Sequence, residues 1–200
     1  MGERLFGARV RRREDSRLVT GQGRYVADVA LPGLLHVAVH RSPHAHARIV
    51  RVDPTPARRR PGVVHVLVPA DAAALGRLPL LVPHASLLAP ACPEILPQQI
   101  VSYAGQAVAL VVAESAAEAE DALDSLHVEY EPLPAVASLE EALRPDGPRV
   151  HPGGNVASRF TQRVGDPAGE LARAPVVLRE RFHLHRGAGM AIETRAIAAR

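Results

Sequence analysis

Apolar and polar residues alternate over residues 34–41, which predicts a β-strand. Leu35, Val37 and Val39 fall on one face of that strand, and Leu34, His36, Ala38 and His40 fall on the other. Residues 47–53 form a second alternating run, so they predict a second strand. Small and polar residues separate the two runs, and this pattern predicts that the two strands form a hairpin.

Residues 107–131 predict a β-α-β unit. Residues 107–113 are continuously apolar, as in a buried strand. Ser115 follows as a helix N-cap, and Glu118, three residues later, completes a capping box. Ala116, Ala119, Leu123 and Leu126 then recur at helical spacing on one face. Residues 127–131 predict the next strand, with Val128 and Tyr130 pointing inward.

Shorter elements fill the rest of the first 145 residues. Residues 14–20 predict a helical turn ended by Gly21, and residues 54–60 predict a connector with one helical turn. Residues 63–68 predict a third strand, central because it is nearly all apolar, and residues 139–143 predict a short helix. Residues 69–100 predict a long surface excursion, because prolines recur there at positions 69, 79, 83, 90, 93 and 97.

A run rich in proline and glycine at residues 145–154 predicts a domain boundary. Beyond it we expect a strand at 158–164, a turn at 165–167, a helical turn at 169–173, and strands at 176–185 and 190–198. The chain therefore divides into an irregular lead-in (1–30), an α+β domain (31–145), a linker (146–155) and an incomplete β-rich segment (156–200).

Composition is that of a globular protein, with 47% apolar and 22% charged residues. The single cysteine, Cys92, excludes an intramolecular disulfide, and neither a secretory signal nor an apolar run of membrane-spanning length is visible. We therefore expect a cytoplasmic chain. The net charge is +3 and the pI about 9.7, but every cation is arginine, which excludes a lysine Schiff base and a P-loop lysine.

Arginine clusters at residues 11–13 and 58–60 raise the question of nucleic-acid binding. Aromatic residues make up only 3% of the chain and tryptophan is absent, so no stacking platform for bases is expected. We expect no nucleic-acid partner.

The densest group of candidate ligands consists of four histidines, His36, His40, His44 and His46. Imidazoles brought together in this way could bind zinc or copper. No carboxylate or cysteine lies at matching spacing, so polar caps on a hairpin or contacts with a partner are the expected role.

Other candidate sites are weaker. Gly21-Gln22-Gly23 lacks the third glycine of a dinucleotide loop, because Val26 occupies that position and no strand precedes it. Cys92 has no nucleophile motif around it. Six acids could supply an acid/base pair but are expected to be solvated surface residues: Glu118, Glu120, Asp121, Asp124, Glu140 and Glu141.

Several ordered stretches carry a resemblance to a known family: residues 12–28, Leu31-Pro32-Gly33, residues 41–49, residues 103–109 and residues 128–133. In this order they resemble the N-terminal a/b hammerhead domain of the large subunit of the xanthine dehydrogenase, aldehyde oxidase and carbon monoxide dehydrogenase family. The resemblance implies an α+β fold with a mixed sheet and one main β-α-β helix. The resemblance further implies that the hammerhead domain is followed by the first strands of a truncated molybdopterin-binding domain.

The resemblance also implies an oxidoreductase function. In that family the large subunit uses a molybdenum–molybdopterin (cytosine dinucleotide) cofactor, and electrons leave through iron–sulfur and flavin partners. Residues 189–196 resemble a stretch that opens the first molybdopterin-binding domain. Glu193 and Arg195 match its core, and Ala196 departs from it. These two residues are candidates for cofactor contact, with a structural Glu–Arg pair as the preferred role.

We expect the chain to act as a scaffold and subunit-contact domain, with the cofactor and the catalytic residues lying outside it. A free-standing binding module without redox function is the alternative, and metal storage through the four histidines is a third reading.

Overall fold

The computed structural model describes residues 6–79, 86–87, 93–184, 187, 189–191 and 193–199. The chain divides into two compact units. One is Gly33–Val176, and the other combines Met1–Pro32 with Val177–Arg200.

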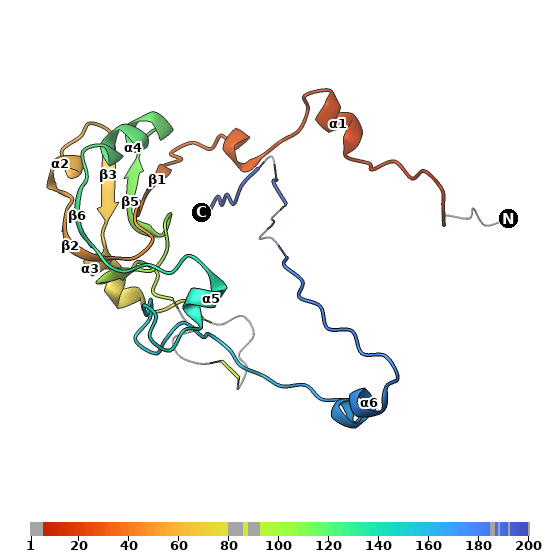
Figure 1. Ribbon diagram of the computed structural model, residues 1–200. Helices are drawn as coiled ribbons and strands as arrows, with labels where there is room; N and C mark the ends of the chain where they lie inside the picture. Colours follow the sequence, from red (N-terminus) through yellow and green to blue (C-terminus); the bar gives the residue numbers. More distant parts are fainter. Residues whose placement is uncertain are drawn as a thin grey trace. The chain divides into compact units, whose positions relative to one another are not determined.

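The unit Gly33–Val176 is built on two three-stranded sheets, in which every pairing is antiparallel (Figure 1). The first sheet has the order β1 (His36–Arg41), β5 (Ala107–Ala113), β3 (Val63–Leu67). The second has the order β4 (Ile100–Val101), β2 (Ala47–Asp53), β6 (His127–Pro132). Helix α4 (Ala116–Leu123) packs on the first sheet. The α+β class expected from the sequence is confirmed.

The predicted hairpin is wrong, because β1 and β2 pair in different sheets. β1 lies beside β5, with Val37 opposite Val112, and β2 lies beside β6. The turn before β5 explains the difference. The backbone N–H of Ser42 donates to Gln106 (2.9 Å), and the N–H of Gly105 donates to the carbonyl of Ser42 (2.8 Å). The backbone that follows β1 is thus bonded to this turn and does not fold back onto β2.

The predicted β-α-β unit has the right elements but the wrong partners. β5 already has β1 on one edge and β3 on the other, so no edge is left for β6. β6 therefore pairs with β2, and the expected mixed sheet is replaced by two antiparallel ones. β5, not β3, is the central strand of its sheet. β3 lies at an edge, where Val64 is 54% exposed.

Small side chains form the core between α4 and the first sheet. Ala109, Val111 and Ala113 of β5 are fully buried, and Ala119 and Ala122 of α4 face them. Alanines on both sides let the helix approach the sheet closely. Ala122 thus takes the buried place expected for Ala116, which is exposed.

The start of α4 is capped by Ser115 as predicted, but the Glu118 carboxylate accepts from the Ser115 hydroxyl and not from its backbone N–H. The Ser115 hydroxyl accepts a bond from the Glu118 N–H (3.2 Å), but it also donates to the Glu118 carboxylate (2.8 Å). An added Cβ at Gly62 would lie 2.2 Å from Glu118 Cδ, so the Glu118 side chain would have to shift away from the Ser115 hydroxyl. Gly62 has φ of +74°, a conformation that favours glycine.

The proline-rich stretch is not entirely a surface excursion. It begins with α3 (Pro69–Ala72) and a 3₁₀ turn, η2 (Ala73–Leu75), and Leu96 is only 2% exposed. Gln98 connects the end of this stretch to its beginning, because its side-chain amide donates to the Pro69 carbonyl (2.6 Å). Residues 80–85 and 88–92, with Cys92, lie outside the described residues.

The predicted short helices are confirmed as α1 (Asp15–Val19), α2 (Thr55–Arg58), α5 (Leu139–Ala142) and α6 (Pro167–Arg173), and η1 (Val26–Asp28) adds a 3₁₀ turn. In the predicted linker, the Asn155 side chain accepts from the Val150 N–H (2.8 Å) and donates to the carbonyls of Ala142 and Pro148. This amide closes an ordered loop. The proposed domain boundary itself stays a prediction.

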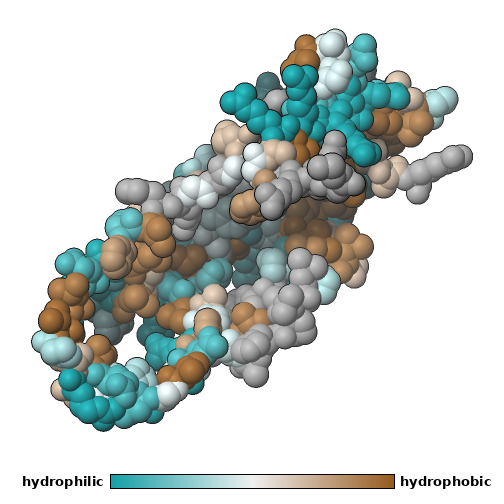
Figure 2. All heavy atoms as spheres, turned by 90° about the vertical axis from the view of Figure 1, so that its right-hand side faces the viewer, coloured by the Kyte–Doolittle hydropathy of each residue, from teal (hydrophilic) through white to brown (hydrophobic). Residues whose placement is uncertain are grey.

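None of the strands predicted at 158–164, 176–185 and 190–198 forms among the residues that the structure describes. Only an isolated bridge joins Leu87 to Ser158. A strand needs a continuous ladder with a neighbour, and among the described residues these stretches have no more than this bridge and the bond from the Arg159 N–H to the Ser86 carbonyl (3.3 Å). Their apolar residues are accordingly exposed, with Phe160 at 73% and Ile197 at 88%. In the face drawn in Figure 2, apolar side chains lie at the surface between polar ones.

Candidate functional site

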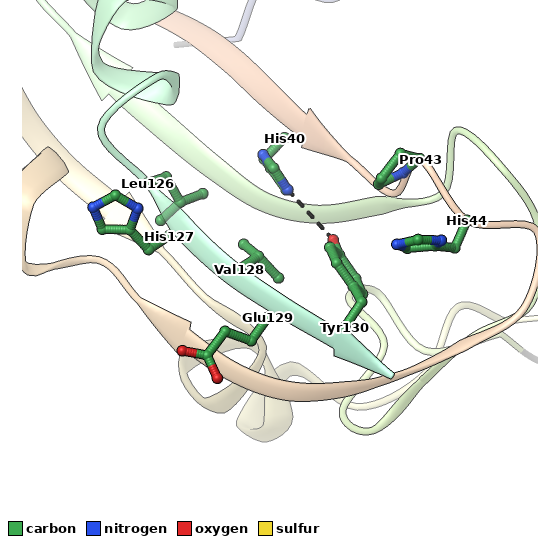
Figure 3. A pocket seen from close by; sticks show the side chains of 8 residues that line it. All are labelled: His40, Pro43, His44, Leu126, His127, Val128, Glu129 and Tyr130. Atoms are coloured by element: carbon green, nitrogen blue, oxygen red, sulfur yellow. Dashed lines mark hydrogen bonds between the residues drawn. The ribbon is translucent and has the colours of Figure 1, made fainter. Parts of the chain in front are cut away.

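Two of the four candidate histidines gather around Tyr130 at the side of β6. The ring of His40 lies with Nε2 3.3 Å from the Tyr130 hydroxyl, and His44 meets the Tyr130 ring edge-on, with centroids 5.2 Å apart (Figure 3). They line an open pocket of about 590 Å³ with Pro43, Leu126, His127, Val128 and Glu129. Figure 3 shows the Glu129 side chain extending away from His40.

The loop that carries His44 is fixed by Ser42, which is 2% exposed. Its hydroxyl accepts from the His44 N–H (3.1 Å) and lies 3.0 Å from the His44 carbonyl, to which it donates. Sequence reasoning placed Tyr130 inward but did not connect Tyr130 or Ser42 with the histidines. The contact joins β1 and β6, which lie in different sheets, and no local pattern reports such a pairing.

His46 lies apart from His40 and His44, and it is 7% exposed. Its Nδ1 is 2.7 Å from the Pro134 carbonyl. A carbonyl only accepts, so Nδ1 carries a proton and donates this bond. His46 lines a second pocket of about 370 Å³, which Arg149 and His151 also line. Within the described parts of the chain, no three His, Cys, Asp or Glu side chains are placed to hold a metal ion.

Burial lowers the pKa of His40 below its ordinary value of 6.5, and burial raises the pKa of Tyr130 above 10.0. Both groups are therefore neutral at pH 7. Because the unfolded chain binds a proton at His40 more readily than the folded chain, the free energy of unfolding falls as the pH drops below about 6.5.

We expect His40→Gln to reduce this loss of stability on acidification. Urea unfolding at about pH 7.5 and about pH 5.5 measures the difference for each protein. His65→Gln is the matched control, since His65 is an exposed histidine on β3. An identical pH dependence in the wild-type and His40→Gln proteins would show that His40 titrates alike in the folded and unfolded states.

Glu193 and Arg195 do not form the predicted pair in the part of the chain that the structure describes. Instead the Glu193 carboxylate accepts a bond from the backbone N–H of Val26, 2.6 Å away. Val26 begins η1, and the neighbouring N–H of Tyr25 donates to Asp28 (2.9 Å). Glu193 is half-buried and Arg195 is exposed. The bond joins residues 167 positions apart, so it connects the two chain segments, Met1–Pro32 and Val177–Arg200, that make up the smaller unit.

Replacing Glu193 with alanine is expected to speed hydrogen exchange at the Val26 amide by about tenfold or more, because a bond to a charged acceptor is lost. Glu193→Gln should keep part of the protection, since its amide oxygen still accepts. Glu180→Ala, a change at an exposed acid of the same unit, should leave the Val26 amide unaffected. Equal exchange in all four proteins would contradict the contact.

The remaining candidates do not meet in a pocket. Glu118 is occupied at the cap of α4, and Glu141 serves the same purpose at α5, where its carboxylate accepts from the Ala137 N–H (3.2 Å). The other four acids, Glu120, Asp121, Asp124 and Glu140, are exposed. Gly21 has φ of +71° just after α1, so Gly21-Gln22-Gly23 is a helix end and not a phosphate loop. None of the helices in the described segments is long and apolar enough to cross a membrane.

Comparison with known proteins identifies the family to which this fold belongs. The model of the aldehyde oxidase and xanthine dehydrogenase a/b hammerhead domain matches residues 20–134. The gamma subunit of the 6-hydroxypseudooxynicotine dehydrogenase complex of Paenarthrobacter nicotinovorans is 37% identical over 96% of this chain and 25% of its own length. The carbon monoxide dehydrogenase large chain of Afipia carboxidovorans is 36% identical over 94% of this chain and 25% of its own.

Solved structures of related enzymes have a similar fold. Quinoline 2-oxidoreductase from Pseudomonas putida 86 superposes with a TM-score of 0.67 at 41% identity, over 83% of this chain and 21% of that one. The aldehyde oxidoreductase of Desulfovibrio desulfuricans gives a TM-score of 0.71 at 27% identity, over 86% and 20%. The chain spans about a quarter of the length of the curated relatives it matches. It belongs to the a/b hammerhead family of aldehyde oxidases and xanthine dehydrogenases.

Proposed function

We propose that this chain is the scaffold and subunit-contact portion of the large subunit of a molybdenum hydroxylase, an oxidoreductase. The observation that carries the proposal is the extent of the match. The hammerhead model covers residues 20–134, and relatives in this class match more than nine-tenths of the chain with only a quarter of their own length. The residues that bind the cofactor and catalyse the reaction then lie outside the chain.

The described pockets do not fit a molybdopterin cofactor. A pterin dinucleotide needs an enclosed cleft with several convergent donors. The pocket at Tyr130 is open and has no arginine in its lining, and the pocket at His46 is lined mostly by prolines and aliphatic side chains. No redox step is assigned to either. We propose the cytosine dinucleotide form of the cofactor for the complete enzyme, on the family resemblance alone.

Glu193 and Arg195 remain the candidates for direct contact with that cofactor, and we propose that their role is structural. Glu193 already accepts the Val26 N–H, so a cofactor would have to share or displace a 2.6 Å bond. Arg195 is exposed and is the freer of the two to meet a partner.

The surface of the unit Gly33–Val176 suits a contact role. Leu35, Val37 and Val64 expose 43–58% of their surface on or beside the first sheet. Leu35 and Val37 lie two positions apart beside and on β1, and exposed apolar side chains that adjoin one another are a feature of protein–protein contact surfaces. We propose that the partners are the rest of the molybdopterin-binding subunit, together with iron–sulfur and flavin subunits, in the cytoplasm.

Co-expression tests the proposal. The partner polypeptide is the part of the Afipia carboxidovorans carbon monoxide dehydrogenase large chain that lies outside the match. We expect the two polypeptides to elute together in size-exclusion chromatography. Separate elution, with this chain a stable monomer, would favour a free-standing binding module and contradict the proposal.

A further inference from the structure

The pocket of about 370 Å³ beside His46 has a wall that is fixed by hydrogen bonds within the larger compact unit. The Leu133 N–H donates to the His46 carbonyl (2.9 Å). The Asn155 side chain accepts from the Val150 N–H (2.8 Å) and so holds the loop that forms the other side. Three of the nine lining residues are prolines, whose rings have no freely rotating side chain. The pocket is therefore formed before any ligand arrives.

His46 presents a ring nitrogen without a partner to this pocket. The residue is 7% exposed, and its Nδ1 donates to the Pro134 carbonyl. Its Nε2 has no hydrogen bond to any residue that the structure describes. No fully enclosed side-chain nitrogen or oxygen in the described chain lacks a partner, so Nε2 must be accessible. Because His46 lines the pocket, Nε2 is the polar atom that it offers to a ligand there.

The other polar side chains of the lining carry or accept positive charge. Arg149 and His151 line the pocket, and no aspartate or glutamate does. Arg149 is exposed and forms no ion pair with a carboxylate of the described residues. The rest of the lining is aliphatic or proline. An unpaired guanidinium and an unpartnered imidazole nitrogen between apolar walls suit an anion with an apolar body.

We propose that this pocket binds a small aromatic carboxylate, with the carboxylate on Arg149 and the aromatic ring against the prolines and aliphatic side chains. A guanidinium bonds both oxygens of a carboxylate at once. A rigid ring loses little conformational freedom on binding to a preformed wall. The volume of about 370 Å³ is that of a small-molecule pocket. The site goes beyond the function proposed above, since it needs neither the molybdenum cofactor nor a partner subunit.

NMR titration of the full chain with 2-naphthoate tests the proposal. We expect a single site with a Kd of about 1 mM or lower, and shifts at the Leu133 and Val150 amides. The uncharged 2-naphthamide should bind at least about tenfold more weakly, because it forms no charged bond with the guanidinium. Acetate keeps the charge but lacks the apolar body, so it should also bind at least about tenfold more weakly.

Two variants locate the site on the chain. Arg149→Gln should weaken 2-naphthoate binding at least about tenfold, and its fold should be intact because the side chain is exposed. Arg163→Gln removes an exposed arginine outside the lining and is the matched control, with an effect of less than about threefold. His46→Asn keeps a donor for the Pro134 carbonyl but removes Nε2, and it should weaken binding about fivefold.

Equal affinity for 2-naphthoate and 2-naphthamide would overturn the proposal, because the pocket would then not recognise the charge. Unchanged binding by Arg149→Gln would overturn it as well. The titration is repeated with the Afipia carboxidovorans polypeptide present, and we expect the affinity to stay within about threefold. Loss of binding on that addition would show that the pocket is a contact for the rest of the subunit; it overturns the ligand site and leaves the scaffold function standing.

Discussion

Aspartate in place of Val111 is expected to destabilise the unit Gly33–Val176 severely. Val111 is fully buried on the central strand β5 and packs in the core that also contains Ala122 and Leu126 of the α4 region. A carboxylate there has no cation to pair with, and an uncompensated buried charge costs about 3–5 kcal/mol. Because domains are stable by only about 5–15 kcal/mol, that loss removes a large part of the margin. Circular dichroism during urea unfolding measures it.

The neighbouring residue provides the control. Val112 is half-buried and points to the opposite face of the sheet, away from α4. Val112→Asp adds the same charge one residue along, and we expect it to cost about 1–2 kcal/mol. Equal destabilisation by the two variants would mean that α4 does not cover the face assigned to it here.

Leu96→Ala is the second large effect, with an expected loss of about 2–5 kcal/mol in the free energy of unfolding. Leu96 is 2% exposed and is the largest of the fully buried side chains among the described residues, although it lies in the proline-rich stretch. Removing three carbons from a buried site leaves a cavity, and the cost rises with the volume that the surroundings do not refill. Chemical denaturation with a linear extrapolation gives the value.

Leu139→Ala is the matched control for Leu96→Ala. It makes the same substitution at a leucine that is 77% exposed at the start of α5, and its cost should stay within about 0.5 kcal/mol. A cost of that size for Leu96→Ala as well would show that the proline-rich stretch is the surface excursion that its sequence predicts.

Local patterns predicted most of the elements of this fold. The helical spacing of Ala119 and Leu123, with Ser115 as the cap, was sufficient to place α4, and alternation was sufficient to place β1, β2 and β6. Strand pairing was predicted wrongly because alternation reports which residues share a face, not which strand lies beside them. The turn at Ser42 and the two occupied edges of β5 decide the pairing, and both depend on distant contacts.

The candidate sites show the same limit. Four histidines close in sequence predicted one cluster, yet His46 bonds to Pro134 while His40 and His44 meet Tyr130. The partner of Glu193 lies 167 residues away, where no spacing rule applies. A burial pattern inside the proline-rich stretch was equally hidden, because Leu96 has no periodic neighbours to mark it.

The most direct test of the scaffold function is the molybdenum content of the purified chain, measured by mass spectrometry with and without the partner polypeptide. The chain alone should carry no molybdenum, and a reconstituted complex should carry about one atom per large subunit, the stoichiometry that a single cofactor site gives. About one tightly bound atom per chain in the absence of any partner would contradict the conclusion that the cofactor site lies outside these residues.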